Sequence, residues 1–493
     1  MKILLVTGRL MEERVREVAD RHGCDVFAAP VDIASFVKAE HMPGLEGYDL
    51  IIFPGYSTAD LAAVERTTGI KTVRGPKDVA NLDAVLRNIE GLELSKTLPA
   101  CVLLKDKLQK EALKEIERID SAAARKRLLK RPGNMLIGGL PVGRDFPMRV
   151  IAEVVDADRR SDGDVLERAR YYIREGVDII DVGLSKKAPS RVKELIKLLR
   201  RLKVPLSVDT MEAENIEAAI EAGADLILSL DRTLIEKLQP TDTPVVIVPG
   251  RETFKDPRER LAALEANMEI ARDRGFRNLI ADPILEPIGS GLADSISAYR
   301  ELGAKGTVPM LMGVGNVTEL TDADSIGMNA ALAGVAMECG VSLLFTTEAS
   351  HKTRGAVREL KRASQMMALA RSRKTMPKDL GIDLLVHKEK TRALGEPAIK
   401  ARRVRAKRGV SRRDSLGDFT ILLEEDKILA VHSKEGKADL IVEGNSARDI
   451  CDTILQRGLV SELGHAMYLG RELEKAEIAL KTGRGYVQEE DVF

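Results

Sequence analysis

The 493-residue chain has no tryptophan, few aromatic residues (3%) and no excess charge, because 77 Lys and Arg residues balance 77 Asp and Glu residues. A chain without net charge lacks the long-range field that draws basic proteins to nucleic acid or to anionic membrane surfaces. We therefore expect no nucleic-acid partner and no membrane partner.

Cysteine is scarce and scattered. The residues Cys24, Cys101, Cys339 and Cys451 lie far apart, and none belongs to a CxxC pair. This pattern excludes a disulfide framework and a cysteine zinc site, and it is typical of reduced thiols in a cytoplasmic protein. Met1 and Lys2 lead directly into an apolar run, so we expect no signal peptide.

Long apolar stretches are also missing. The longest, residues 326–345, is interrupted by Asn329 and Glu338. A membrane-spanning helix needs about 20 predominantly apolar residues. A helix followed by a buried strand explains this stretch better than a membrane span.

The dominant pattern is a set of short apolar runs that end in a polar residue and alternate with helical segments. Continuous apolar runs predict strands that are buried on both faces, as in a parallel sheet. Eight such units in roughly 230 residues predict a (β/α)8 TIM barrel, which typically needs about 250. The eight runs are residues 148–155, 179–182, 206–209, 226–228, 245–248, 278–281, 310–312 and 343–345. The helical segments are 164–175, 190–202, 212–222, 256–275, 292–302, 327–339 and 353–370.

Residues 1–130 predict a separate Rossmann-like α/β domain that ends in a charged helical connector. Its expected strands are 2–8, 25–28, 49–55, 70–73 and 101–104, and its first helix is 12–22. Only Thr7, Gly8 and Arg9 follow the first strand, where a dinucleotide-binding domain has GxGxxG. We therefore expect a supporting or lid role for this domain.

The segments that flank the barrel have distinct patterns. Residues 131–372 form the expected barrel domain, and two apolar runs at its start, split by Gly138 and Gly139, predict a hairpin that closes the barrel bottom. Residues 373–413 predict a basic linker, solvated or alternatively bound to an acidic partner. Residues 414–493 predict a small α+β domain.

Polar residues follow the predicted barrel strands. They are Asp156, Asp158, Asp181, Asp209, Ser229, Asp231, Asp282, Asn316 and residues 346–348. The absence of His and Cys from this set argues against nucleophilic and zinc chemistry, and we expect no metal site. Carboxylates accept paired hydrogen bonds from adjacent N–H donors, such as the edge of a 2-amino-4-oxo pteridine.

Each acid also has a structural alternative. Asp209 and Asp231 precede helical segments and could serve as N-caps. Asp282 precedes Pro283 and fits that role less well. Asp181 lies within an apolar run and should be buried, where an unpaired charge is costly. Three acids at three strand ends favour a binding site over incidental capping.

Several motifs resemble one family. EGVDIIDVG (175–183), PLSVDT (205–210), EAGADLI (221–227), IADP (280–283) and MGVGN (312–316) occur in the order found in the pterin-binding barrel. That barrel is shared by dihydropteroate synthases and methyltetrahydrofolate–corrinoid methyltransferases. The resemblance implies that Asp209 and Asp282 contact a pterin ring, that Asp181 supports them, and that Ser229 stands where synthases have an Asn.

The chain departs from the synthases at several positions. Residues 315–318 replace their Ser-Arg-Lys, and the resemblance to the methyltransferase branch implies that Asn316 binds the pterin. The first loop, residues 154–164, lacks their Asn, and the last strand lacks their Arg-Val-His. The candidates for binding phosphate are therefore Arg159, Arg160, Lys352 and Arg354, with exposed charged loops as the alternative.

The three-part chain resembles archaeal dihydropteroate synthase-related proteins. The resemblance implies a cytoplasmic transferase of tetrahydromethanopterin biosynthesis, with pterin and arylamine substrates; Mg²⁺ and a homodimer are left open. A methyl-tetrahydropterin:corrinoid protein methyltransferase is the alternative, and only that function would require a corrinoid. A non-catalytic pterin-binding protein is a third hypothesis.

Overall fold

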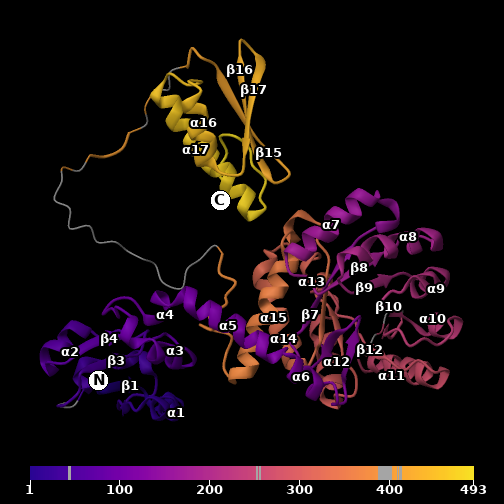
Figure 1. Ribbon diagram of the computed structural model, residues 1–493, viewed down its shortest axis with the longest axis horizontal. Coiled ribbons are helices and arrows are strands. Elements are labelled where there is room, and N and C mark those ends of the chain that lie inside the picture. Colours follow the sequence, from indigo (N-terminus) through magenta and orange to yellow (C-terminus); the bar gives the residue numbers. More distant parts are fainter. Residues whose placement is uncertain are drawn as a thin grey trace. The chain divides into compact units, whose positions relative to one another are not determined.

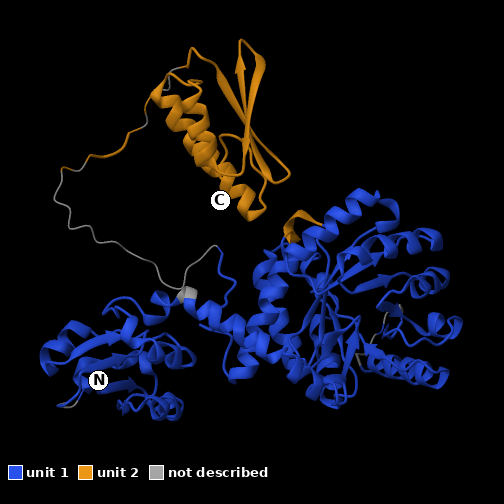
Figure 2. Ribbon diagram, in the orientation of Figure 1, with its two compact units in different colours: residues 1–349, 355–387 blue, residues 350–354, 388–493 orange. Residues whose placement is uncertain are grey.

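The computed structural model describes residues 1–42, 46–250, 254, 257–386, 402, 404–407, 409 and 413–492. Two compact units make up the chain, residues 1–349 with 355–387 and residues 350–354 with 388–493 (Figure 2). The expected domain boundaries stay predictions, and much of the basic linker lies outside the described residues. None of the described helices combines the length and the apolar character that a membrane crossing demands.

The first unit begins with a four-stranded parallel sheet in the order β2-β1-β3-β4 (Figure 1). Its two faces have separate cores, because Ile3 and Leu5 pack with one helix layer while Leu4 and Val6 pack with another. This confirms a doubly wound α/β arrangement. Its elements are β1 (Ile3–Thr7), α1 (Glu12–His22), β2 (Asp25–Ala28), β3 (Leu50–Phe53), α2 (Leu61–Thr68), β4 (Lys71–Arg74) and α3 (Leu82–Arg87).

The strand predicted at residues 101–104 is wrong. This segment forms the short helix α4 (Ala100–Leu103), and Ala100 and Leu104 pack with Val85 and Leu108. An apolar run of four residues is too short for its periodicity to distinguish a strand from one helical turn. The charged connector forms the predicted helices, α5 (Lys105–Ile119) and α6 (Ala122–Leu128).

The next part of the first unit is the predicted barrel. Its eight parallel strands pair in the order β12-β11-β10-β9-β8-β7-β14-β13, and a parallel bridge between Ala281 and Met310 joins the two ends. The strands are β7 (Arg149–Val154), β8 (Ile179–Gly183), β9 (Leu206–Asp209), β10 (Leu226–Leu230), β11 (Val245–Ile247), β12 (Leu279–Ala281), β13 (Leu311–Gly313) and β14 (Leu343–Thr346).

Helices surround the barrel strands (Figure 1), and their apolar faces pack on the outward side chains of the strands in one large core. They are α7 (Asp162–Arg174), α8 (Pro189–Leu199), α9 (Ala213–Ala222), α10 (Arg232–Lys237), α11 (Pro257–Arg274), α12 (Leu292–Lys305), α13 (Gly315–Thr318), α14 (Ser325–Cys339) and α15 (Ala356–Arg373). Helices α10 and α13 were not predicted, because neither is long enough to show a helical period.

The predicted hairpin consists of β5 (Asn134–Ile137) and β6 (Leu140–Gly143). Ile137 and Val142 are fully buried in one cluster with the interior strand residues Ile151, Ile179 and Leu226. These three lie in the first half of their strands. The hairpin therefore closes the amino-terminal end of the barrel and leaves the carboxyl end for a site.

The described residues of the second unit form a three-stranded antiparallel sheet and two α-helices. Phe419, Ile428 and Ala430 of the sheet form its core together with Ile450 and Leu473 of the helices. This confirms the predicted α+β fold. Its elements are β15 (Asp418–Glu424), β16 (Lys427–Lys434), β17 (Lys437–Gly444), α16 (Ala447–Gln456) and α17 (Leu463–Thr482).

Candidate functional site

The strand-end acids face the inside of the barrel because side chains alternate along a strand. Ile151 and Ile179 belong to the interior cluster. Side chains two positions further along the same strands point to the same face. Glu153 and Asp181 therefore point inward, and Asp282 does so by the same alternation from the interior residue Ile280.

A cavity of about 400 Å³ opens at the carboxyl ends of the barrel strands. Leu228, Val246, Leu311 and Phe345 give it an apolar lining from four strands. The predicted site residues that line it are Asp209, Ser229, Asp282 and Asn316. An apolar cavity of this size with a few convergent polar groups is typical of a site for a small ring compound.

Asp282 has one oxygen fixed by the protein. Oδ1 accepts hydrogen bonds from the Tyr299 hydroxyl at 2.5 Å and from the Ile284 N–H at 2.8 Å. Oδ2 accepts none from any described residue. Burial raises the pKa of the Asp282 carboxyl to about 6, against the opposing effect of these two bonds. Asp282 is therefore ionised at neutral pH, with an oxygen left to receive a ligand's donors.

Glu153 and Asp181 are neighbours on paired strands, and the pKa of each carboxyl is raised. Burial, with Asp209 and then Asp156 nearby, raises the pKa of Glu153 to about 7. Burial, with Asp209 and then Glu153 nearby, raises the pKa of Asp181 well above its usual range.

Both carboxyl groups of this pair are closely packed by neighbouring residues. Ser207 Oγ donates to Asp181 Oδ1 at 2.6 Å, whereas the buried Asp181 Oδ2 has no hydrogen-bond partner among the described residues. Glu153 occupies space left by Gly183, where an added Cβ would collide with Glu153 Oε1. Asp181 is fully buried and supports the cavity from within the barrel, while Glu153 lines it.

Two lining residues have unusual backbone conformations. Ser229 and Ile284 have φ of 63° and 67°, in the left-handed region that non-glycine residues rarely adopt. Each such residue costs about 1–3 kcal/mol and persists only where the surrounding structure imposes it. At Ile284 this conformation aims the N–H at the carboxylate of Asp282. The rim is thus held in a fixed shape at a cost in stability.

Of the two acids that precede helical segments, Asp231 is a helix cap and Asp209 is not. Asp231 Oδ1 accepts from the Leu234 N–H at 2.9 Å and caps α10, so capping is confirmed for Asp231. Helix α9 begins at Ala213 with Glu212 at its N-cap, so Asp209 is not its cap. Asp209 is instead a partly buried side chain of the cavity.

We predict that Asp231→Ala lowers the free energy of unfolding by about 1 kcal/mol, because the first turn of α10 loses its side-chain acceptor. Asp231→Asn should retain most of the stability, since Asn is an equally good cap. Thermal unfolding of the two variants beside the parent chain measures the difference. Equal stability of all three proteins would contradict the capping role.

Asn316 lines the cavity, whereas Arg159 and Arg160 of the first loop do not. Asn316 Nδ2 donates to the Leu285 carbonyl at 2.9 Å, which fixes the amide at the start of α13. Arg160 Nε donates to the Val155 carbonyl at 2.7 Å. The exposed Arg159 guanidinium makes no hydrogen bond or ion pair with any residue that the structure describes. Among the described residues, no Lys or Arg lines the cavity.

The other two phosphate candidates belong to the second unit. Lys352 and Arg354 are exposed, and Arg354 Nη2 lies 2.6 Å from Asp426 Oδ1 within that unit. A phosphate-binding role for all four basic residues stays a prediction. So does a contribution from Mg²⁺; the described residues contain no group of three or more His, Cys, Asp or Glu side chains placed to hold a metal ion.

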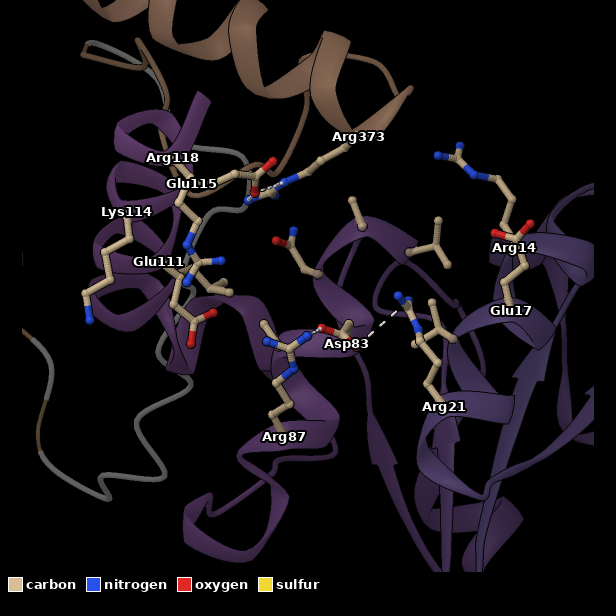
Figure 3. A pocket seen from close by; sticks show the side chains of 16 residues that line it. Arg14, Glu17, Arg21, Asp83, Arg87, Glu111, Lys114, Glu115, Arg118 and Arg373 are labelled. Atoms are coloured by element: carbon tan, nitrogen blue, oxygen red, sulfur yellow. Dashed lines mark hydrogen bonds and ion pairs between the residues drawn. The ribbon is translucent and has the colours of Figure 1, made fainter. Parts of the chain in front are cut away.

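A second hollow, of about 560 Å³, is lined by charged side chains from α1, α3, α5 and α15 (Figure 3). Asp83 pairs with Arg87 and lies 3.8 Å from Arg21, while Glu115 pairs with Arg373 at 2.9 Å. None of the predicted site residues is among its lining residues. Its ion pairs between helices are those of a structural contact.

Three residues of the barrel site were not predicted. Glu153 had a visible signal, because it is a lone carboxylate inside the apolar run RVIAEV. Ser207 had a weaker one, as the polar residue inside LSVD. Tyr299 had none, because its hydroxyl reaches Asp282 from the middle of α12, and only the packing of that helix brings the two together.

Comparisons with known proteins find related sequences for the barrel and for the second unit. Residues 155–347 match the family described as pterin binding enzyme, and residues 413–489 match the family PterinBD-DUF4346. An uncharacterized protein of Methanocaldococcus jannaschii is 34% identical over 536 residues, covering 100% of this chain and 99% of its own length. The dihydropteroate synthase of Clostridium beijerinckii is 30% identical over 189 residues, 32% of this chain and 68% of that enzyme.

Solved structures of dihydropteroate synthases also match. The Thermus thermophilus enzyme covers 47% of this chain and 97% of its own, at 24% identity and a TM-score of 0.38. The Xanthomonas albilineans enzyme, solved in complex with 7,8-dihydropteroate, covers 47% and 95% at 22% identity and a TM-score of 0.38.

Proposed function

Because the chain belongs to the pterin-binding family related to dihydropteroate synthase, we propose that it is a dihydropteroate synthase-like transferase of tetrahydromethanopterin biosynthesis. Its substrates would be a hydroxymethyl-dihydropterin diphosphate and an arylamine. The observation that supports this most directly is the cavity that Asp209 and Asp282 line together with apolar side chains. Such a cavity suits a flat ring that carries an amino group beside a ring N–H.

The residues of the chain have distinct roles in this proposal. Asp282, ionised and held through Oδ1, offers Oδ2 to the donors of the ring, and such charge-assisted hydrogen bonds are the strong ones. Asn316 and Ser229 complete the polar rim. The C–O bond to diphosphate breaks, a C–N bond to the arylamine forms, and the nitrogen loses a proton. Glu153, with a pKa of about 7, is suited to take that proton at neutral pH.

A specific observation favours a second candidate. No Lys or Arg among the described residues lines the cavity, although a diphosphate leaving group needs positive partners. Asn316 does line it, as the resemblance to the methyltransferase branch implies. Methyl transfer from a methyl-tetrahydropterin to a corrinoid protein would use the same ring contacts, and the raised pKa of Glu153 would suit protonation of the ring as well.

An assay with two arms separates the candidates. Purified protein is mixed with the pterin diphosphate and 4-aminobenzoate or a ribofuranosyl-aniline phosphate, and separately with methyl-tetrahydropterin and a cob(I)alamin protein. We expect diphosphate release in the first arm and its loss in Asp209→Asn. Demethylation in the second arm alone would replace the proposal with methyl transfer. Tight pterin binding without either product would indicate a non-catalytic pterin-binding protein.

A further inference from the structure

The amino-terminal sheet has a cavity of its own, of about 850 Å³, which the proposed function does not use. Residues at the carboxyl ends of its strands line it, among them Thr7 of β1, Phe53 of β3 and Gly75 after β4. In the order β2-β1-β3-β4, β2 and β3 flank β1 on opposite sides. In open α/β sheets, ligands bind outside the carboxyl ends where the connections diverge in this way.

Apolar side chains dominate this cavity and stay exposed around it. Leu10, Ile33 and Met376 all line it, with exposures of 72%, 50% and 71%. Exposed apolar side chains that gather in one patch, especially around a concavity, are typical of a binding site. A volume of this size is in the range of cavities that hold small organic ligands.

Two lysines give the cavity positive charge. The Lys77 and Lys378 ammonium groups lie 5.4 Å and 4.2 Å from the centroid of the Tyr56 ring, and all three residues line the cavity. Neither ammonium forms an ion pair with a carboxylate among the described residues. The two lysines lie roughly 300 residues apart in the chain, so the fold alone brings them to one ring.

The two carboxylates of this cavity contact groups other than the lysines. Asp78 accepts a hydrogen bond from the Ala80 N–H at 2.9 Å and caps the turn that follows β4. Asp32 Oδ1 lies 3.8 Å from Arg9 Nη1. Among the described residues neither acid forms an ion pair with Lys77 or Lys378, so both ammonium groups can receive an incoming anion.

We propose that this cavity binds a small organic anion with an aromatic or other apolar body and a carboxylate, sulfonate or phosphate group. The apolar body lies against the strand ends, and the anionic group lies beside Lys77 and Lys378. Dinucleotides do not fit this description, because Thr7, Gly8 and Arg9 lack the glycine pattern that admits a pyrophosphate to the first strand.

A pair of fluorescent ligands tests the proposal on the full chain. One is 8-anilinonaphthalene-1-sulfonate, an aromatic anion, and the other is the neutral N-phenyl-1-naphthylamine. We expect the double variant Lys77→Met, Lys378→Met to weaken sulfonate binding about tenfold, the effect of losing charged partners, and to leave the neutral ligand unchanged. Ser35→Phe, which fills the cavity from its lining, should weaken binding of both ligands.

The controls isolate this cavity. Lys71→Met removes an exposed lysine from the amino end of β4, the opposite end of the sheet, and should change neither affinity. Saturating 6-hydroxymethylpterin should leave sulfonate binding intact, because the pterin occupies the barrel. The proposal is overturned if pterin displaces the sulfonate, or if Ser35→Phe has no effect. It is also overturned if sulfonate binding disappears as the protein self-associates in sedimentation runs, since a second copy would then cover the cavity.

Discussion

Asp282→Asn is expected to weaken pterin binding about 100-fold. In the variant an NH2 group replaces the free carboxylate oxygen Oδ2. This group is a donor, so it faces the donors of the ring and cannot accept hydrogen bonds from them. Hydrogen bonds to charged groups contribute about 1.5–3 kcal/mol each, and a loss of about 3 kcal/mol corresponds to about 100-fold in affinity. Isothermal titration with 6-hydroxymethylpterin measures the change directly.

The matched control for this variant is Asp231→Asn, because Asp231 caps α10 and also lines the same cavity. Asp231 is a helix cap, and Asn caps as well, so its pterin affinity should equal that of the parent chain. If both variants bind pterin as the parent does, Asp282 does not contact the ring. If both lose binding equally, a general change in the charge of the cavity is responsible instead.

The pKa of about 6 for Asp282 adds a pH dependence to this prediction. Only the ionised carboxylate accepts both donors, so pterin affinity should be highest above about pH 7 and fall as the pH is lowered through 6. Asp282→Asn has no proton to gain at this position and should show a smaller dependence. Titrations between about pH 5 and 8 compare the two proteins.

Glu153→Gln is expected to stabilise the protein at alkaline pH. In the folded chain the pKa of Glu153 is raised from 4.5 to about 7. Below pH 4.5 both folded and unfolded states are protonated, and no penalty exists. Between 4.5 and 7 the unfolded state ionises first, so the stability of the parent falls as the pH rises, by about 3 kcal/mol at most. The neutral Gln does not incur this loss.

Thermal unfolding at about pH 5 and pH 8 tests this prediction. The difference in stability between the two pH values should shrink by about 2–3 kcal/mol in Glu153→Gln. Glu301→Gln, an exposed residue of α12, is the control and should keep the pH dependence of the parent. An unchanged dependence in Glu153→Gln would mean that its carboxyl is as well solvated in the folded chain as in the unfolded one.

Local patterns predicted the barrel well because its strands are buried on both faces. In residues 179–183 and 206–209 the outward positions are apolar, and a single acid, Asp181 or Asp209, stands among the inward positions, so both the strand and the position of its acid were visible. The hairpin at residues 134–143 was visible because two glycines interrupt apolar runs. The pattern could not distinguish helix from strand at residues 101–104, where a single helical turn is as apolar as a strand.

Capping was the question that the sequence left open, and tertiary structure decided it differently for two similar acids. Asp209 and Asp231 each follow a strand and precede a helical segment. Helix α10 starts directly after Asp231, whereas α9 starts only at Ala213, beyond a turn that leaves Asp209 at the cavity. No local signal fixes the length of that turn.

The amino-acid sequence by itself determined the parallel barrel, the end at which its acids collect and the family resemblance, because period and composition are local properties. Tertiary structure alone decided that Tyr299 holds Asp282, that Glu153 shares its surroundings with Asp181, and that Lys77 and Lys378 meet at Tyr56. These groups are far apart in the chain. Their hydrogen bonds, pKa values and charges depend on distances that only the packing of helices and strands sets.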